Sequence, residues 1–238
     1  MKSEEKADFP ERFRALPYSA AAAAYARAMT SEAENLVQSA TARAAVPFVP
    51  EVTLLTAAEP FGLWGRTERD APPFWAFPWA GGQGLARYVL DHPAAVAGCR
   101  VLDVASGSGL VAIAAAKAGA AAVAAGDIDD NALAAIALNA AANGTPQVRP
   151  RRVDLAATGG ARAQVVLAAD VFYQRELAAL ALAFLKAARR AGATVLAADP
   201  GRAFLPAADL VPVTSYRIPV LAILEDAPVK TVTIYRLP

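Results

Sequence analysis

The sequence predicts an α/β protein with a mostly parallel sheet that is covered on both faces. After Gly82, short apolar segments alternate with alanine-rich segments of helical length, and turn residues separate them. A glycine-rich turn follows one apolar segment, and acidic residues follow several others. Because parallel strands end at one edge of their sheet, where α/β proteins bind ligands, these observations predict a binding site at that edge.

The part before this alternation is predicted to be mostly helical. Residues 18 to about 45 contain neither Gly nor Pro and are rich in alanine, which predicts one or two helices. The segment "VPEVTLLTAAEP" then predicts a short strand between prolines. Residues 57–82 are rich in proline, glycine and aromatic residues, and they contain all three tryptophans of the chain.

The alternating part predicts five strands, four helices and a final hairpin. Pro150 lacks a backbone donor, so the third strand is expected at an edge or a bulge of the sheet. Two extended segments around "EDAPV" predict an antiparallel hairpin at residues 211–238. The strands are expected at residues 99–105, 121–127, 147–155, 163–170 and 193–201, and the helices at residues 84–93, 109–119, 130–144 and 174–190.

Composition excludes several classes of protein. The 238 residues carry a net charge of +1 without a long basic run, which argues against tight nucleic-acid binding. Cys99 is the single cysteine, so neither an internal disulfide nor a thiolate metal site is expected. The longest apolar stretch, residues 110–126, contains Lys117 and is too short to cross a membrane. The start "MKSEEKADFP" lacks a secretory apolar region, so a cytoplasmic location is expected.

The glycine turn carries the strongest functional signal. Gly107 and Gly109 belong to a G-x-G-x-x-A pattern that is also typical of dinucleotide sites. Asp103 lies four residues before this turn and would repel a pyrophosphate there, at a cost of about 1 kcal/mol or more. S-adenosylmethionine (SAM) carries no phosphate, and its ammonium and sulfonium groups suit a carboxylate. Asp103 therefore favours SAM over a nicotinamide dinucleotide.

Two further acids follow the next two strands. Asp127 lies eighteen residues after Gly109, a separation expected for a carboxylate that accepts both ribose hydroxyls, although NAD enzymes use the same feature. Asp154 follows the third strand and is a candidate for the adenine amino group. The alternatives are structural: Asp103 as a cap of the following turn, Asp127 and Asp129 as solvated acids at a helix start, and Asp154 as a merely exposed residue.

Four stretches of the chain together carry a family resemblance: "VPEVTLLTA", "PPFWAFPWAGGQGLARYVLDHP", "VLDVASGSGLVAIAAAKAGA" with "AAGDIDDNALAAIALNAAANG", and "VVLAADVFYQREL" with "VLAADPGR". With them the chain resembles class I, seven-strand SAM-dependent methyltransferases, and more closely bacterial relatives of the electron transfer flavoprotein β-subunit lysine methyltransferase. The resemblance implies a Rossmann-like sheet of order 3-2-1-4-5-7-6 with strand 7 antiparallel. We expect this domain to span residues 48–238, after a helical extension at 1–47. Ala105 and Phe74 depart from the pattern, where Gly and Tyr are expected.

The resemblance also implies a protein lysine as the methyl acceptor, with the electron transfer flavoprotein β subunit as the expected substrate. An Asp-x-x-Tyr signature on the acceptor side corresponds to Asp170 and Tyr173. Asp170 would hold the amine and aim its lone pair, and Tyr173 would wall the channel. Methyl transfer from a sulfonium is an in-line displacement that needs no metal, so His92 and Cys99 are expected to be structural.

The remaining assignments are more open. Ile128, next to Asp127, completes the predicted cofactor site. Trp79 is expected either to border the adenine or the channel, or to belong to a plain aromatic core. Asp199 and Arg202 either shape the acceptor site or form a structural turn. Other acceptors (a ribosomal protein or a small amine), an NAD(P)-dependent oxidoreductase and a non-catalytic binding module remain as alternatives, and the oligomeric state is open.

Overall fold

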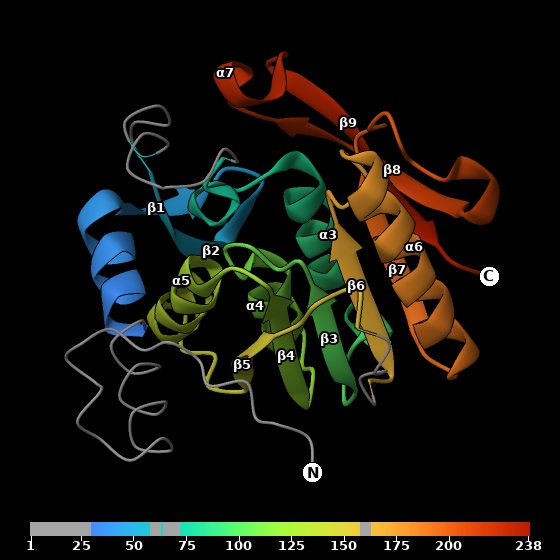
Figure 1. Cartoon of the computed structure of the whole chain (residues 1–238), viewed down its shortest axis with the longest axis horizontal. Coiled ribbons are helices and arrows are strands. Elements are labelled where there is room, and N and C mark those ends of the chain that lie inside the picture. Colours follow the sequence, from blue (N-terminus) through green and yellow to red (C-terminus); the bar gives the residue numbers. More distant parts are fainter. Residues whose placement is uncertain (1–29, 58–62, 64–71, 158–162) are drawn as a thin grey trace, which may run out of the picture.

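The computed structural model describes residues 30–57, 63, 72–157 and 163–238 (Figure 1). Residues 30–40 are helical, and β1 (Ala42–Val46) pairs with β2 (Val49–Thr56) in a small antiparallel sheet. The expected strand around residues 49–56 is therefore confirmed. The expectation of helix up to residue 45 is wrong for β1, because its pairing with β2 overrides the weak helical preference of its alanines. Most of the expected extension 1–47, including residues 18–29, lies outside the described residues.

The larger sheet of the described residues has seven strands in the order β5-β4-β3-β6-β7-β9-β8. Neighbours from β5 to β7 are parallel, whereas β9 is antiparallel to both β7 and β8. Counted from β3, this is the order 3-2-1-4-5-7-6 with strand 7 antiparallel, as the resemblance implies. The strands are β3 (Arg100–Val104), β4 (Ala122–Asp127), β5 (Val148–Arg152), β6 (Val165–Ala169), β7 (Thr194–Asp199), β8 (Val211–Pro219) and β9 (Val229–Arg236).

Helices cover both faces of this sheet (Figure 1). Side chains alternate between the faces along each strand, so Val101 and Leu167 are buried with α3 (Ala80–Asp91) and α4 (Leu110–Lys117). Leu102 and Val166 point the other way, into a core shared with α6 (Arg175–Arg190). Further helices are α5 (Asp130–Ala142), α7 (Ala222–Glu225) and the short 3-10 helices η2 (Phe74–Ala76), η3 (Pro93–Ala95) and η4 (Ala207–Asp209).

Three sequence details are placed as expected. Pro150 lies in β5, at the edge of the sheet, where a missing donor is tolerated. His92 ends α3 just before Pro93, and its exposed ring stacks on Tyr88 at 4.4 Å between centroids. Cys99 is partly buried against the core. Among the described helices, none combines the length and apolar character needed to cross a membrane.

Candidate functional site

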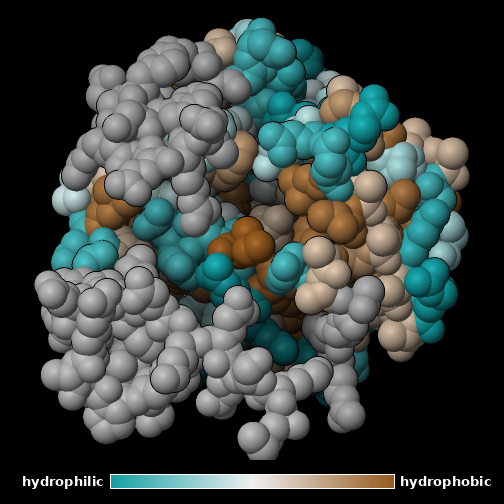
Figure 2. Space-filling view, in the orientation of Figure 1, coloured by the Kyte–Doolittle hydropathy of each residue, from teal (hydrophilic) through white to brown (hydrophobic). Residues whose placement is uncertain are grey.

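A cavity of about 640 Å³ lies at the carboxyl ends of β3, β4 and β6. This volume is typical of small-molecule sites, which span about 300–1,000 Å³. Figure 2 shows hydrophobic residues gathered around a hollow on this face of the molecule. The predicted site residues that line the cavity are Trp79, Asp103, Gly107, Asp127, Ile128, Asp170 and Tyr173.

Asp103 lies at the floor of the cavity and is almost fully buried, with 2% of its surface exposed. Its Oδ2 accepts hydrogen bonds from the Ser106 hydroxyl and from the backbone N–H of Ala112 at 3.2 Å. Burial raises the pKa of Asp103 to about 7, and these hydrogen bonds oppose the rise. Asp103 makes no ion pair with a described residue, so its negative charge is available to a bound cation.

Asp127, at the end of β4, organises the neighbouring loop. Its Oδ2 accepts the N–H of Gly107 at 2.9 Å, and its Oδ1 accepts those of Ile128 and Asp129 at 2.8 and 3.0 Å. Burial raises the pKa of Asp127, and the three backbone hydrogen bonds oppose this effect. The predicted alternative of a solvated acid at a helix start does not describe Asp127, because this partly buried carboxylate supports the turn and faces the cavity.

The glycine turn requires unusual backbone angles, but only part of it faces the cavity. Gly107 lines the cavity and has φ +53°, and Gly109 has φ +83° at the start of α4. Gly109 is absent from the lining, and a Cβ there would meet Ile136 of α5 at 3.3 Å. Its role is close packing of α4 against α5. Ala105, where a glycine was expected, has φ +50°, a left-handed conformation that an alanine adopts with strain.

Aromatic rings form the opposite wall. Phe74 lies 5.7 Å from Trp79 and 5.2 Å from Tyr173, measured between ring centroids. The Trp79 indole N–H donates to the carbonyl oxygen of Phe74 at 2.9 Å, which fixes the ring beside the cavity. Both interpretations of this segment hold in part, because Trp79 borders the cavity while Trp75 and Phe77 are buried core residues that also reach its lining.

Asp170 lies just after β6, at the end of the cavity farther from Asp127 along the sheet. Its backbone is left-handed, with φ +54°, and 14% of its side chain is exposed. Oδ2 accepts the N–H of Gly82 at 2.9 Å, and Oδ1 accepts from Arg202 Nη2 at 3.3 Å. Burial raises the pKa of Asp170 to about 7, while the charge of Arg202 opposes the rise. The carboxylate is therefore fixed, with lone pairs left for a further donor.

This contact depends on a glycine that the sequence did not single out. A Cβ on Gly81 would lie 2.6 Å from Asp170 Oδ2, closer than any real contact allows, whereas a Cβ on Gly82 would meet only Leu110 at 3.8 Å. The start of α3 and the Asp170 loop can approach each other only because residue 81 has no side chain. A double glycine just before the predicted helix 84–93 is the signal that could have indicated it.

Asp154 is not brought to the cavity. It is exposed after the edge strand β5, and its Oδ1 accepts the N–H of Ala156 at 2.8 Å. The structure thus favours the alternative that Asp154 is merely an exposed residue, and its predicted contact with adenine stays without support. Sequence reasoning also missed Ser106, whose hydroxyl donates a hydrogen bond to Asp103, and Glu225, which pairs with Arg202.

Comparisons with known proteins agree with this geometry. Residues 88–201 match the family described as "Ribosomal protein L11 methyltransferase (PrmA)". The chain is 37% identical over 161 residues to the electron transfer flavoprotein beta subunit lysine methyltransferase of Xenopus laevis, covering 66% of this chain and 65% of that protein. It is 32% identical over 173 residues to a homolog of that enzyme from Caenorhabditis elegans, covering 64% of this chain and 70% of that protein.

A solved structure shows the same fold. The ribosomal protein L11 methylase from Lactobacillus delbrueckii subsp. bulgaricus superposes with a TM-score of 0.52 and 20% identity, covering 81% of this chain and 98% of that one. The sheet order and the cavity at its edge thus define a class I methyltransferase fold. Within this class, the chain belongs to the electron transfer flavoprotein β-subunit lysine methyltransferase family. It spans slightly less than two thirds of the Xenopus protein's length.

Proposed function

We propose that this protein transfers a methyl group from SAM to a lysine side chain of the electron transfer flavoprotein β subunit. One observation carries the proposal: the fixed, partly buried carboxylate of Asp170 lines the same cavity as the carboxylate of Asp103, which has no described cationic partner. One carboxylate suits a cationic methyl donor, and the other suits an amine acceptor. The acceptor protein follows from the names of the relatives reported above.

The residues of the cofactor side fit SAM. When bound, SAM supplies an electrophilic methyl group on a sulfonium. Asp103 would complement the cationic amino-acid end, and Asp127 would accept hydrogen bonds from the ribose hydroxyls while its backbone contacts keep the turn in place. Trp79 and Ile128 supply apolar walls for the adenine. Asp103, beside the glycine turn, also opposes a pyrophosphate there, which argues against the NAD(P) alternative.

On the acceptor side, the protein must present a neutral amine although lysine has a pKa near 10.4 in water. The aromatic wall of Phe74 and Tyr173 would desolvate the ammonium and so lower its pKa. Asp170 would accept hydrogen bonds from the amine through the lone pairs that Gly82 and Arg202 leave free, and so aim the nitrogen at the methyl group. Positioning and exclusion of water then account for most of the rate.

The proposal is tested with the pure protein, SAM labelled in its methyl group and the purified β subunit from the same organism. We expect label on a lysine of the β subunit, located by mass spectrometry of its peptides. Ribosomal protein L11 and free amines serve as competing acceptors in parallel reactions. Label that enters only L11 or only small amines would replace the proposed acceptor, and binding of NAD(P) instead of SAM in calorimetry would reject the enzyme class.

The expected cytoplasmic location belongs to the same proposal. The single cysteine, which leaves no internal disulfide, supports it. Cell fractionation followed by immunodetection of the protein tests it.

A further inference from the structure

A buried ion cluster lies behind the acceptor end of the cavity. Arg202 Nη2 is 3.3 Å from Asp170 Oδ1 and 2.9 Å from Glu225 Oε2, so one nitrogen is shared between two carboxylates. The side chain of Glu225 is only 3% exposed, and that of Arg202 is 23% exposed. Arg202 and Asp170 line the cavity, whereas Glu225 does not. Glu225 therefore contacts the reaction site through Arg202.

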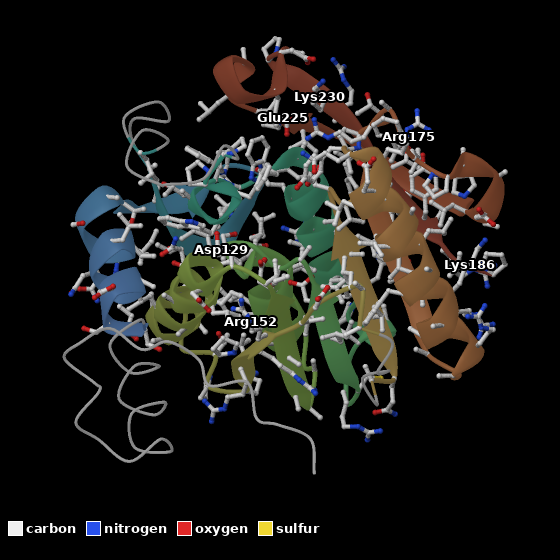
Figure 3. The ribbon with its side chains drawn as sticks, viewed as in Figure 1. Asp129, Arg152, Arg175, Lys186, Glu225 and Lys230 are labelled. Carbon is white, nitrogen blue, oxygen red and sulfur yellow. The ribbon has the colours of Figure 1, made fainter. Side chains whose placement is uncertain are left out.

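The two carboxylates also hold the same helix end. Glu225 Oε1 accepts the N–H of Ala80 at 3.2 Å, and Asp170 Oδ2 accepts that of Gly82 at 2.9 Å. These amides belong to the first turn of α3, where backbone donors lack helical partners and the helix dipole favours negative charge. Figure 3 shows Glu225 on the α7 segment, close to this end of α3. The connection between β8 and β9 is thus tied to the acceptor end of the cavity.

Asp199 fixes the backbone of Arg202, the cation of the cluster. At the end of β7, its Oδ1 accepts the N–H groups of Gly201 and Arg202 at 2.7 and 2.6 Å, which shapes the turn that carries the arginine. The guanidinium therefore starts from a fixed backbone, and Glu225 determines where its tip lies. With three carboxylates and one guanidinium, the cluster carries an excess of negative charge when all groups are ionised.

We infer that Glu225 is a positioning residue for methyl transfer, which holds the Arg202 guanidinium so that it is shared with Asp170 instead of donated wholly to it. The inference rests on the proposed function. Without the Glu225 charge, Arg202 would pair with Asp170 alone and occupy lone pairs that the amine needs.

The electrostatic surroundings of Asp170 make this inference directional. Glu225 from α7 and Asp199 at the end of β7 raise the pKa of Asp170, and Arg202 lowers it. Tyr173 lies on the same loop as Asp170, and the described part of α3 contributes backbone amides to the contact. Removal of the Glu225 charge should therefore lower the pKa of Asp170, and removal of the Arg202 charge should raise it.

The kinetic test compares Glu225→Gln with the wild-type protein, with the β subunit as acceptor. We expect kcat to fall roughly tenfold to hundredfold, because misplaced reacting groups lose rates of that order, while the Kd for SAM stays within about threefold. Glu51→Gln is the matched control, since Glu51 pairs with Arg87 at 2.7 Å on the surface, away from the cavity. An unchanged kcat for Glu225→Gln beside an active wild type would overturn the inference.

A second measurement needs no acceptor protein. Carbon-13 NMR of the Asp170 carboxyl, assigned with Asp170→Asn, gives its titration midpoint in the wild type, Glu225→Gln and Arg202→Met. We expect a midpoint near 7 in the wild type, a shift to lower pH in Glu225→Gln and a shift to higher pH in Arg202→Met. If the three proteins had the same midpoint, the inference would be rejected even if the proposed function were confirmed. A lower midpoint in Glu225→Gln together with a higher one in Arg202→Met would support the inference even if another acceptor were found.

Discussion

The cavity joins two halves that use the same strand-end position differently. On the cofactor side, Asp103 and Asp127 accept hydrogen bonds from a hydroxyl and from backbone amides, and no described cation pairs with them. On the acceptor side, Asp170 shares the cationic Arg202 with Glu225. Neutral donors leave Asp103 and Asp127 without a compensating cation, whereas Arg202 compensates part of the negative charge of Asp170.

This difference matches the two ligands of the proposed reaction. A permanently cationic methyl donor benefits from uncompensated charge, because its binding does not depend on losing a proton. The acceptor amine must become neutral before it reacts, so a strongly negative site would hold it as an unreactive ammonium. Partial compensation by Arg202 is therefore suited to the acceptor side. Substitutions on the acceptor side should therefore lower turnover, and substitutions on the cofactor side should weaken SAM binding.

The largest effect is expected for Asp170→Ala. Loss of the carboxylate removes the group that aims the amine, so turnover should fall on the order of a thousandfold or more. The Kd for SAM, measured by calorimetry, should change by less than about threefold, because Asp103 and Asp127 remain. Weakened SAM binding with a normal residual rate would assign Asp170 to the wrong half.

Gly81→Ala should reduce kcat about a hundredfold and leave SAM binding intact. The new Cβ would lie 2.6 Å from Asp170 Oδ2, so the carboxylate must move by a distance that costs rates of this order. Gly82→Ala is the matched control, because its Cβ meets only ordinary contact at 3.8 Å and alanine favours the helix. Equal rates for the two variants would contradict the proposed dependence on the approach of α3 to Asp170.

Asp103→Asn should weaken SAM binding by about tenfold to hundredfold, the value of a lost interaction with a charged partner. Its kcat at saturating SAM should change much less than that of Asp170→Ala. Asp154→Asn provides the comparison, since this exposed acid also follows a strand but does not reach the cavity. A comparable loss of affinity in Asp154→Asn would restore its predicted contact with the cofactor.

SAM affinity should decrease with acidity, by up to about tenfold per pH unit below 7, if one proton must leave Asp103 on binding. Calorimetry at pH 6, 7 and 8 measures this, and Asp103→Asn should flatten the dependence.

The stability of the unliganded protein should depend on pH in the opposite sense to its affinity for SAM. Raised pKa values mean that the folded protein binds more protons than the unfolded chain. Its free energy of unfolding should therefore decrease as the pH rises from about 4 to 7. The raised carboxyls are Asp103, Asp127, Asp170 and Asp199.

The smallest effect is expected for Ala105→Gly, which should raise the free energy of unfolding by about 0.5–1 kcal/mol. The left-handed conformation of Ala105 destabilises the folded protein by about 1–2 kcal/mol, which glycine would avoid. Glycine also gives the unfolded chain more conformational freedom, which offsets about 0.4–1 kcal/mol of this gain. Urea denaturation measures the change, and kcat should remain within about twofold. A destabilised variant would mean that the Ala105 methyl group makes a compensating contact.

The fold could be predicted because its signals are local. Apolar segments of strand length, separated by turn residues, predicted the five parallel strands and the hairpin, and Pro150 predicted the edge position of β5. The order of the strands required the family resemblance, since no local pattern specifies which strands become neighbours. The error at β1 has the same origin: its alanines favour a helix, and only pairing with β2 makes them extended.

Prediction of the site succeeded where one residue at a strand end was sufficient, as for Asp103, Asp127 and Asp170. Prediction failed where a role depends on distant segments. Glu225 lies 55 positions after Asp170 in the chain. Nothing in its sequence surroundings, "AILEDAP", indicates that its side chain is buried. Asp154 shows the reverse case: it follows an edge strand and lies outside the cavity lining, so its predicted contact with the cofactor stays a prediction without support from the structure.

The capped start of α3 has a practical consequence for engineering. This helix is completed by carboxylates from far later in the chain, Asp170 and Glu225. A chimera that receives the β8–β9 connection of a relative without an acid at the Glu225 position would leave the Ala80 amide bare inside the protein. Retargeting such an enzyme by loop exchange therefore calls for transplanting that carboxylate together with the new specificity loop.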